Sequence, residues 1–124
     1  MKVTSGHTPG VLTFLFDVTE NGRTLRAGLL GGVGIKMVRS FFLDHFDLPH
    51  SIQTEVLKNI EELKKEKVDI HLGNHPGDNT VVLKREKQLL EGGNPFIDPE
   101  EWLTFLNSYE AKIRAIIEEE ANEA

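Results

Sequence analysis

The chain has five histidines and no cysteine, so imidazole and carboxylate groups are the only side chains available to bind a transition metal directly. His7 and His75 stand out because each lies in a segment bounded by glycine and proline. These segments read Ser-Gly-His-Thr-Pro-Gly in residues 5–10 and Gly-Asn-His-Pro-Gly in residues 73–77. A neutral imidazole held in such a loop can offer a nitrogen to zinc at about 2.0–2.1 Å. We therefore predict that both are metal ligands; the alternative role is that of solvated or helix-capping loop histidines.

The other three histidines fit structural roles better. His71 and His75 are four residues apart, a spacing that places two zinc ligands on one face of a helix, but their surroundings indicate a strand followed by a loop. We expect His71 to pack against a sheet or to orient a neighbour. His45 and His50 flank a junction between two expected helices, where partly exposed side chains are the simpler interpretation.

A second motif is the glycine-rich segment 28–36, Gly-Leu-Leu-Gly-Gly-Val-Gly-Ile-Lys, which suggests a phosphate-binding loop. Its spacing satisfies neither G-x-x-x-x-G-K-[ST] nor G-x-G-x-x-G, and no serine or threonine follows Lys36 directly. Nucleotide binding is therefore disfavoured, and the glycines predict a loop or a close backbone approach. Asp78 and Asn79 are candidates for orienting His75, although such a pair more often forms a turn.

Length and composition predict one domain over residues 1–124, with 39% hydrophobic residues available for a core. The net charge is −6, and the lysines and arginines are scattered among acids rather than gathered into a basic stripe. That distribution argues against nucleic acid as a partner. No stretch approaches the roughly 20 apolar residues of a membrane-spanning helix. With no cysteine to form disulfides, we expect a cytoplasmic protein.

The strands are predicted from β-branched and aromatic runs. Residues 11–18 form one such run, and the Glu-Asn-Gly turn signal at 20–22 separates it from the alternating segment 24–30, which together predict a β-hairpin. Residues 68–72 predict a short strand after a helix, the order expected at the edge of an α/β layer.

Helical periodicity predicts a short helix over residues 35–46, a stronger one over 49–65 and an amphipathic one over 81–90 that Gly92 and Gly93 close. A last helix should start at Asp98 as N-cap and bury one face. Its acidic residues 118–120 oppose the helix dipole and should fray. The expected buried face consists of Trp102, Phe105, Leu106, Tyr109, Ile113, Ile116 and Ile117.

Three features in order resemble the metallo-β-lactamase superfamily. His-Thr-Pro-Gly at residues 7–10 is similar to its third metal motif, and residues 69–75 resemble the strand that leads to its last metal histidine. The segment Asn-Pro-Phe-Ile-Asp-Pro at 94–99 is similar to the C-terminal part of the third lactamase subclass. The resemblance implies an α/β fold, the C-terminal half of an αββα sandwich, built from a β-hairpin, helices, one further strand and a long C-terminal helix.

The same resemblance implies that His7 binds one metal ion and His75 a second. The resemblance implies zinc, with iron or manganese as alternatives, and we expect low occupancy. In that family the metal lowers the pKa of a bound water and polarises the scissile bond. The family signature His-x-His-x-Asp-His is absent from this sequence, and the position that often holds a bridging aspartate falls in the Gly31-Gly32 region. We therefore expect a truncated hydrolase domain that is inactive or incomplete by itself.

Two further expectations follow from the resemblance. Half of a sandwich leaves a sheet face and a strand edge uncovered, so the expected partner is a second copy in a homodimer or the N-terminal half of the domain. The alternative function is a non-catalytic binding or scaffolding module that retains the half-fold. A third possibility is an unrelated small α/β protein whose loop histidines bind no metal.

Overall fold

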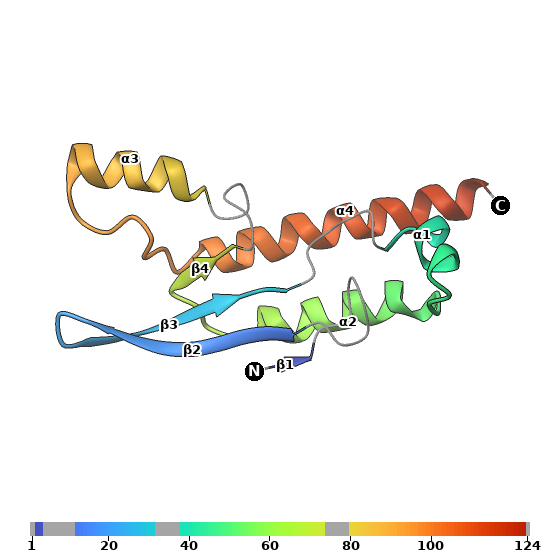
Figure 1. Cartoon of the computed structure of the whole chain (residues 1–124), viewed down its shortest axis with the longest axis horizontal. Coiled ribbons are helices and arrows are strands. Elements are labelled where there is room, and N and C mark those ends of the chain that lie inside the picture. The colour runs from blue at the N-terminus through green and yellow to red at the C-terminus, as the bar shows by residue number, and fades with distance from the viewer. Residues whose placement is uncertain (1, 4–11, 32–37, 74–79, 124) are drawn as a thin grey trace.

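A computed structural model describes residues 2–3, 12–31, 38–73 and 80–123, and it combines one sheet with four helices in these ranges (Figure 1). His7, His75, Asp78 and Asn79 lie outside the described residues. The elements in chain order are β1 (Lys2–Val3), β2 (Leu12–Glu20), β3 (Arg23–Leu29), α1 (Ser40–His45), α2 (Ser51–Lys64), β4 (Ile70–Leu72), α3 (Val81–Glu91) and α4 (Glu101–Glu123).

The sheet has the strand order β1-β2-β3-β4. β2 and β3 form the predicted antiparallel hairpin, and their turn holds Asn21 and Gly22 at φ of 51° and 75°. Positive φ at both central residues is what the type I′ turn between twisted strands requires, and it explains the Asn-Gly pair. β4 lies at the edge of the sheet, as predicted, and it runs parallel to β3. β1, which pairs with β2, was not predicted from the sequence.

α2 and α4 run side by side and supply most of the core (Figure 1). Trp102 at the start of α4 is buried, and its indole N–H donates a hydrogen bond to the carbonyl of Leu63 at 3.0 Å. This bond satisfies the one polar atom of the largest buried side chain and ties α4 to the last turn of α2. The predicted buried face of α4 is confirmed, with Phe105 and Ile117 partly buried at its margins.

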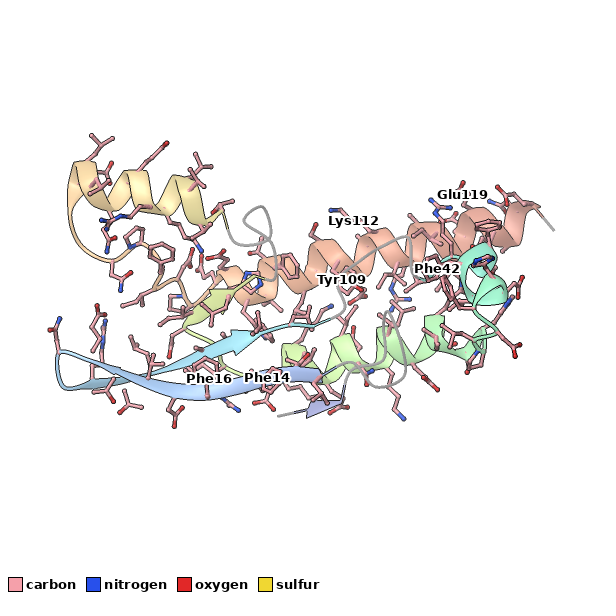
Figure 2. All side chains as sticks on the ribbon, viewed as in Figure 1. Phe14, Phe16, Phe42, Tyr109, Lys112 and Glu119 are labelled. Carbon is pink, nitrogen blue, oxygen red and sulfur yellow. The ribbon has the colours of Figure 1, made fainter. Side chains whose placement is uncertain are left out.

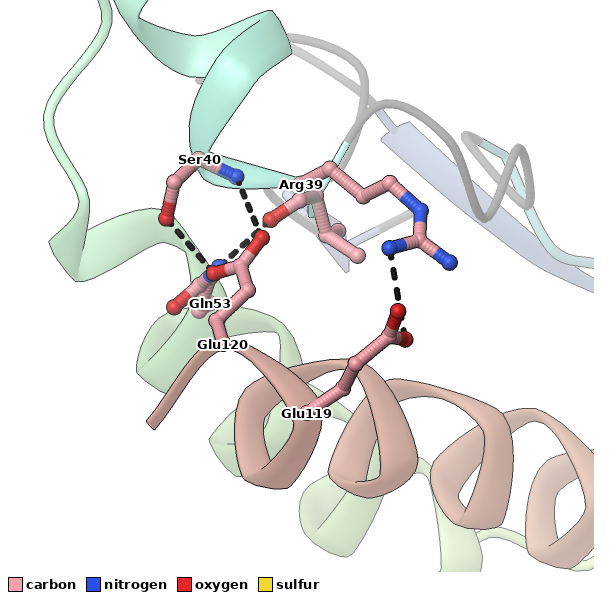
Figure 3. A network of polar contacts seen from close by, with 6 residues as sticks. Arg39, Ser40, Gln53, Glu119 and Glu120 are labelled. Atoms are coloured by element: carbon pink, nitrogen blue, oxygen red, sulfur yellow. Dashed lines mark hydrogen bonds and ion pairs between the residues drawn. The ribbon is translucent and has the colours of Figure 1, made fainter. Parts of the chain in front are cut away.

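Two helix predictions require correction. α1 begins at Ser40 rather than at residue 35, because Arg39 has extended backbone with ψ of 141° and the described residues 38 and 39 precede the helix. The acidic end of α4, residues 118–120, is helical, since the helix continues to Glu123. The carboxylate of Glu120 accepts hydrogen bonds from the backbone N–H and the hydroxyl of Ser40 at 2.8 and 2.6 Å (Figure 3). Its charge therefore compensates the positive N-terminal end of α1.

α3 differs from the other long helices because none of its residues is buried. Its side chain Lys84 reaches Glu101 at the start of α4, whereas the Gln88 amide donates to the carbonyl of Gly93 directly after the helix's own C-terminal end. The predicted closing glycines Gly92 and Gly93 have φ of 76° and 73°, a region that glycine adopts without strain. Among the described residues, no helix is long and apolar enough to cross a membrane.

Candidate functional site at one end of the sheet

The strand register brings three strand ends together. Phe14 near the start of β2 pairs with Leu29 at the end of β3, and Leu29 pairs with Leu72 at the end of β4. β2 runs antiparallel to β3 while β4 runs parallel to it. The N-terminal end of β2 and the C-terminal ends of β3 and β4 therefore lie at the same end of the sheet (Figure 1). We call this end of the sheet the loop end.

The segments that carry both predicted ligands are attached at the loop end. Residues 4–11 join β2 directly before Leu12, and residues 74–79 follow Gly73, one residue after β4. Strands are spaced about 4.8 Å apart, so β2 and β4 are separated across β3 by roughly 10 Å. His75 is three residues beyond Leu72 and His7 five before Leu12. At roughly 3.3 Å per residue, the chain length permits the two imidazoles to meet.

His71 is a packing residue, as the sequence suggested. Its side chain is 1% exposed and lies on β4 among aromatic rings, 4.5 Å from the Phe105 ring centroid and 5.8 Å from that of Trp102. Its Nδ1 is 3.5 Å from the carboxylate of Glu101. His71 therefore links β4 to the start of α4, one residue before β4 ends at the loop end.

Sequence reasoning missed the charged group beside His71. Glu101 accepts from the Lys84 ammonium at 2.7 Å, and both side chains are mostly buried. The same ammonium lies 5.6 Å from the ring centroid of Phe96. In the sequence, Glu101 is only one of the acidic residues that follow the predicted N-cap Asp98. The apolar periodicity of the sequence could not reveal the ion pair between Lys84 and Glu101, because Lys84 lies on the polar side of α3.

Asp69 and Arg26 extend the pairing of β3 with β4. The Asp69 N–H donates to the Arg26 carbonyl at 2.8 Å, and the Arg26 N–H donates to the Asp69 carboxylate at 2.9 Å. The Arg26 guanidinium also contacts Glu66 at 2.8 Å. These contacts hold the edge strand that leads to residues 74–79.

The remaining histidines are placed away from the loop end. His45 and His50 are exposed residues at the C-terminal end of α1 and directly before α2, and His50 Nε2 is 2.6 Å from Asp44 Oδ1. His45 stacks on Phe41 with ring centroids 6.4 Å apart. Within the described ranges, no three His, Asp or Glu side chains form a group that could hold a metal ion.

The fold can be compared with solved structures. No protein-family profile matches the sequence, and no curated protein matches it. The subclass B3 metallo-β-lactamase BJP-1 of Bradyrhizobium japonicum is similar with a TM-score of 0.82 and 20% identity, over 98% of this chain and 45% of that one. Native FEZ-1 from Legionella gormanii gives 0.81 and 22%, over 94% and 44%. MEM-A1, a subclass B3 enzyme from a soil metagenome, gives 0.77 and 20%, over 99% and 47%.

These likenesses establish the fold, and they cover nearly all of this chain. The chain spans about 45% of the length of the solved structures it matches. The expected architecture, a hairpin with helices, one further strand and a long C-terminal helix, is confirmed. The chain therefore has the fold of somewhat less than half of a subclass B3 metallo-β-lactamase.

Proposed function

We propose that this chain is a metal-binding member of the metallo-β-lactamase-type hydrolases, with His7 and His75 as ligands, and that one copy is not a complete catalyst. The observation that supports this most strongly is the strand register at the loop end. It attaches both histidine-bearing segments about two strand spacings apart, on β2 and β4, which flank β3 in one sheet. Catalytic groups are commonly presented in this way, on loops held by a rigid scaffold.

The available donors limit what the metal can do. A catalytic zinc ion takes about three protein ligands and leaves one position open. The resemblance assigns the two histidines to different ions, and even on one shared ion they supply only two nitrogens, to which the described part of the chain adds no ready-made cluster. Two imidazoles fit zinc, iron or manganese held at low occupancy. When bound, such an ion would supply Lewis acidity and an activated water for hydrolysis.

The chain's own residues contribute positioning. His71, packed between Trp102 and Phe105, fixes the strand that precedes residues 74–79. Asp69 and Arg26 fix the same strand from its other end through paired hydrogen bonds. A ligand carried on a strand held at both ends loses less conformational freedom when it binds a metal.

A second candidate function is a non-catalytic binding module that retains the half-fold. The observation that favours it is exposed apolar surface, since Phe14 and Phe16 on β2 are 43% and 44% exposed and Leu90 on α3 is 86% exposed. Under this alternative the fold serves association only, and the histidines have no metal to bind.

Metal analysis separates the two functions. Protein purified without chelator is analysed for zinc, iron and manganese by mass spectrometry, and its thermal midpoint is followed as each metal is added. We expect measurable metal and a stabilising shift that His7→Ala and His75→Ala each reduce. The matched controls are His45→Ala and His50→Ala, exposed histidines away from the loop end. Trace metal only, with no shift from any of the three ions, would refute the proposal.

Catalytic incompleteness is tested separately. Because the second part of the proposal concerns one copy, a chromogenic β-lactam should be hydrolysed no faster than in buffer containing the same metal. Efficient turnover by the purified chain, lost in His75→Ala, would contradict that part while leaving metal binding supported.

A further inference from the structure

Glu101, the first residue of α4, lies where three elements meet. Its carboxylate accepts from the Lys84 ammonium of α3, at 2.7 Å to one oxygen and 2.5 Å to the other. The same carboxylate is 3.5 Å from His71 Nδ1 of β4. The side chains of Lys84 and Glu101 are 11% and 18% exposed, so the ion pair is largely removed from solvent. One carboxylate therefore contacts side chains of both β4 and α3.

The two contacts of this carboxylate lie on either side of residues 74–79, the segment that carries His75. His71 is the middle residue of β4, the strand that leads into the segment. Lys84 is the fourth residue of α3, the helix that follows the segment, and so belongs to its first turn. Glu101 therefore contacts the element before the segment and the element after it.

β4 and α3 differ in how much they depend on Glu101. β4 pairs with β3, and the Asp98 N–H donates to the carbonyl of Asp69, the residue before β4, at 2.8 Å. No residue of α3 belongs to the core. Figure 2 shows several α3 side chains directed away from the rest of the described chain, and Leu90 is 86% exposed. Among ion pairs between described residues, only that of Lys84 with Glu101 joins α3 to another helix or strand.

We propose that Glu101 is a positioning residue for the metal site, an inference that rests on the proposed function of His75. By holding Lys84, Glu101 fixes the first turn of α3 and with it the far end of residues 74–79. Separating a buried ion pair leaves an uncompensated charge, so such a pair specifies one arrangement even where it adds little net stability. A segment whose two ends are fixed loses less conformational entropy when its ligand binds. Glu101 acts through α3 and needs no contact with the metal.

Zinc binding to the full chain, measured by competition with a chromogenic chelator, tests this role. We expect Glu101→Gln and Lys84→Met each to weaken zinc binding about tenfold, an effect typical of residues that orient metal ligands. The double variant should bind zinc as weakly as either single variant, because both remove the same contact. If the double variant regained the affinity of the unaltered chain, the single losses would arise from an unpaired charge, and the proposal would be wrong.

Glu110→Gln is the matched control. Glu110 also lies on α4 and pairs with a lysine, but its partner is Lys64 of α2. Loss of that pair should lower the free energy of unfolding and leave zinc affinity unchanged. An equal loss of zinc affinity in Glu110→Gln would mean that any weakening of α4 lowers binding, and it would overturn the positioning role of Glu101.

Hydrogen exchange of the chelator-treated protein reports on the same ion pair without zinc. The amides of α3 should exchange faster in Glu101→Gln than in the unaltered chain, while those of α2 keep their protection. Unchanged exchange in α3 would overturn the inference even if zinc binds. If the unaltered chain bound no zinc, the proposed function would be refuted together with this role. If it bound zinc and both single variants bound it equally well, only the role of Glu101 would be refuted.

Discussion

Gly28 on β3 lies directly against the indole of Trp102: a Cβ atom at position 28 would be 2.9 Å from Cζ3 and 3.2 Å from Cη2 of that ring. Trp102 cannot retreat easily, because it is 2% exposed and its N–H is bonded to Leu63. Gly28→Ala should therefore destabilise the fold by about 1–3 kcal/mol, the usual cost of overpacking, despite the better strand preference of alanine. Urea unfolding measures the loss.

The contact with Trp102 is identified by a double-variant cycle. Phe lacks the second ring, so Trp102→Phe removes the atoms that crowd position 28. In that background Gly28→Ala should cost clearly less than it does alone. Equal costs in both backgrounds would show that the strain arises elsewhere, for example at Leu15, whose Cδ2 would lie 3.2 Å from the added atom.

Glu120→Gln should weaken the join between α1 and α4 by roughly 1 kcal/mol, a value reduced by solvent screening at a partly exposed site. Burial raises the pKa of Glu120, but hydrogen bonds from Ser40 and Gln53 outweigh burial, so the pKa is lowered. The stabilisation is therefore present near neutral pH and disappears as pH falls through the folded-state pKa. Glu119→Gln is the control, because Glu119 is 53% exposed and contacts only Arg39 at 3.5 Å among the described ion pairs (Figure 3). Equal losses in both variants would contradict the capping role.

Glu110 should make the free energy of unfolding depend on pH in the acid range, more steeply than Glu120 does. Hydrogen bonds from Lys64 and then Arg114 lower the pKa of Glu110 from 4.5 to about 2. Its contribution to folding should be complete above pH 4.5 and should be lost as pH falls toward 2. Glu110→Gln should flatten the slope of unfolding free energy against pH in that window, measured by urea titration at several pH values. Glu118→Gln, on the exposed side of the same helix, should leave the slope unchanged.

Tyr109 is the only tyrosine of the chain, so its ionisation can be followed by ultraviolet absorbance without a variant. Burial raises the pKa of Tyr109 from 10.0 to about 12. The neutral phenol stabilises the fold fully below pH 10, and this contribution is lost between pH 10 and 12, where the unfolded chain ionises first. We expect the native midpoint near 12 and a midpoint near 10 in denaturant. A native midpoint near 10 would mean that α4 does not bury this side chain.

The elements that the sequence predicted well are those with a strong local signal. The Asn-Gly turn placed the hairpin. Asp98, expected as the N-cap of the last helix, lies in the turn before α4, which begins at Glu101, and its carboxylate accepts from the Glu100 N–H at 3.0 Å. Apolar periodicity also identified the buried face of α4. Each of these depends on residues within one turn or one helix, where spacing and geometry are tightly coupled.

What the sequence could not provide depends on contacts far apart in the chain. In the sequence, Glu120 is an acidic residue at the negative end of the helix dipole. In the fold its carboxylate accepts a hydrogen bond from the backbone N–H of Ser40, 80 residues away. α3 was predicted as an amphipathic helix, but no periodic pattern indicated that its contact with α4 is made by Lys84 through Glu101. The nearness of the segments carrying His7 and His75 follows from the parallel pairing of β4 with β3, which periodicity alone does not specify.

The last prediction separates two histidines that are four residues apart. His71→Ala should cost about 2–3 kcal/mol, because it opens a cavity beside Trp102 and Phe105 and removes the contact with Glu101. Metal content, measured on folded protein, should stay at the level of the unaltered chain. His75→Ala should do the reverse, lowering metal content while leaving the metal-free unfolding free energy unchanged within about 0.5 kcal/mol. If His71→Ala removed the metal from protein that remains folded, His71 would belong to the metal site and its role as a packing residue would be wrong.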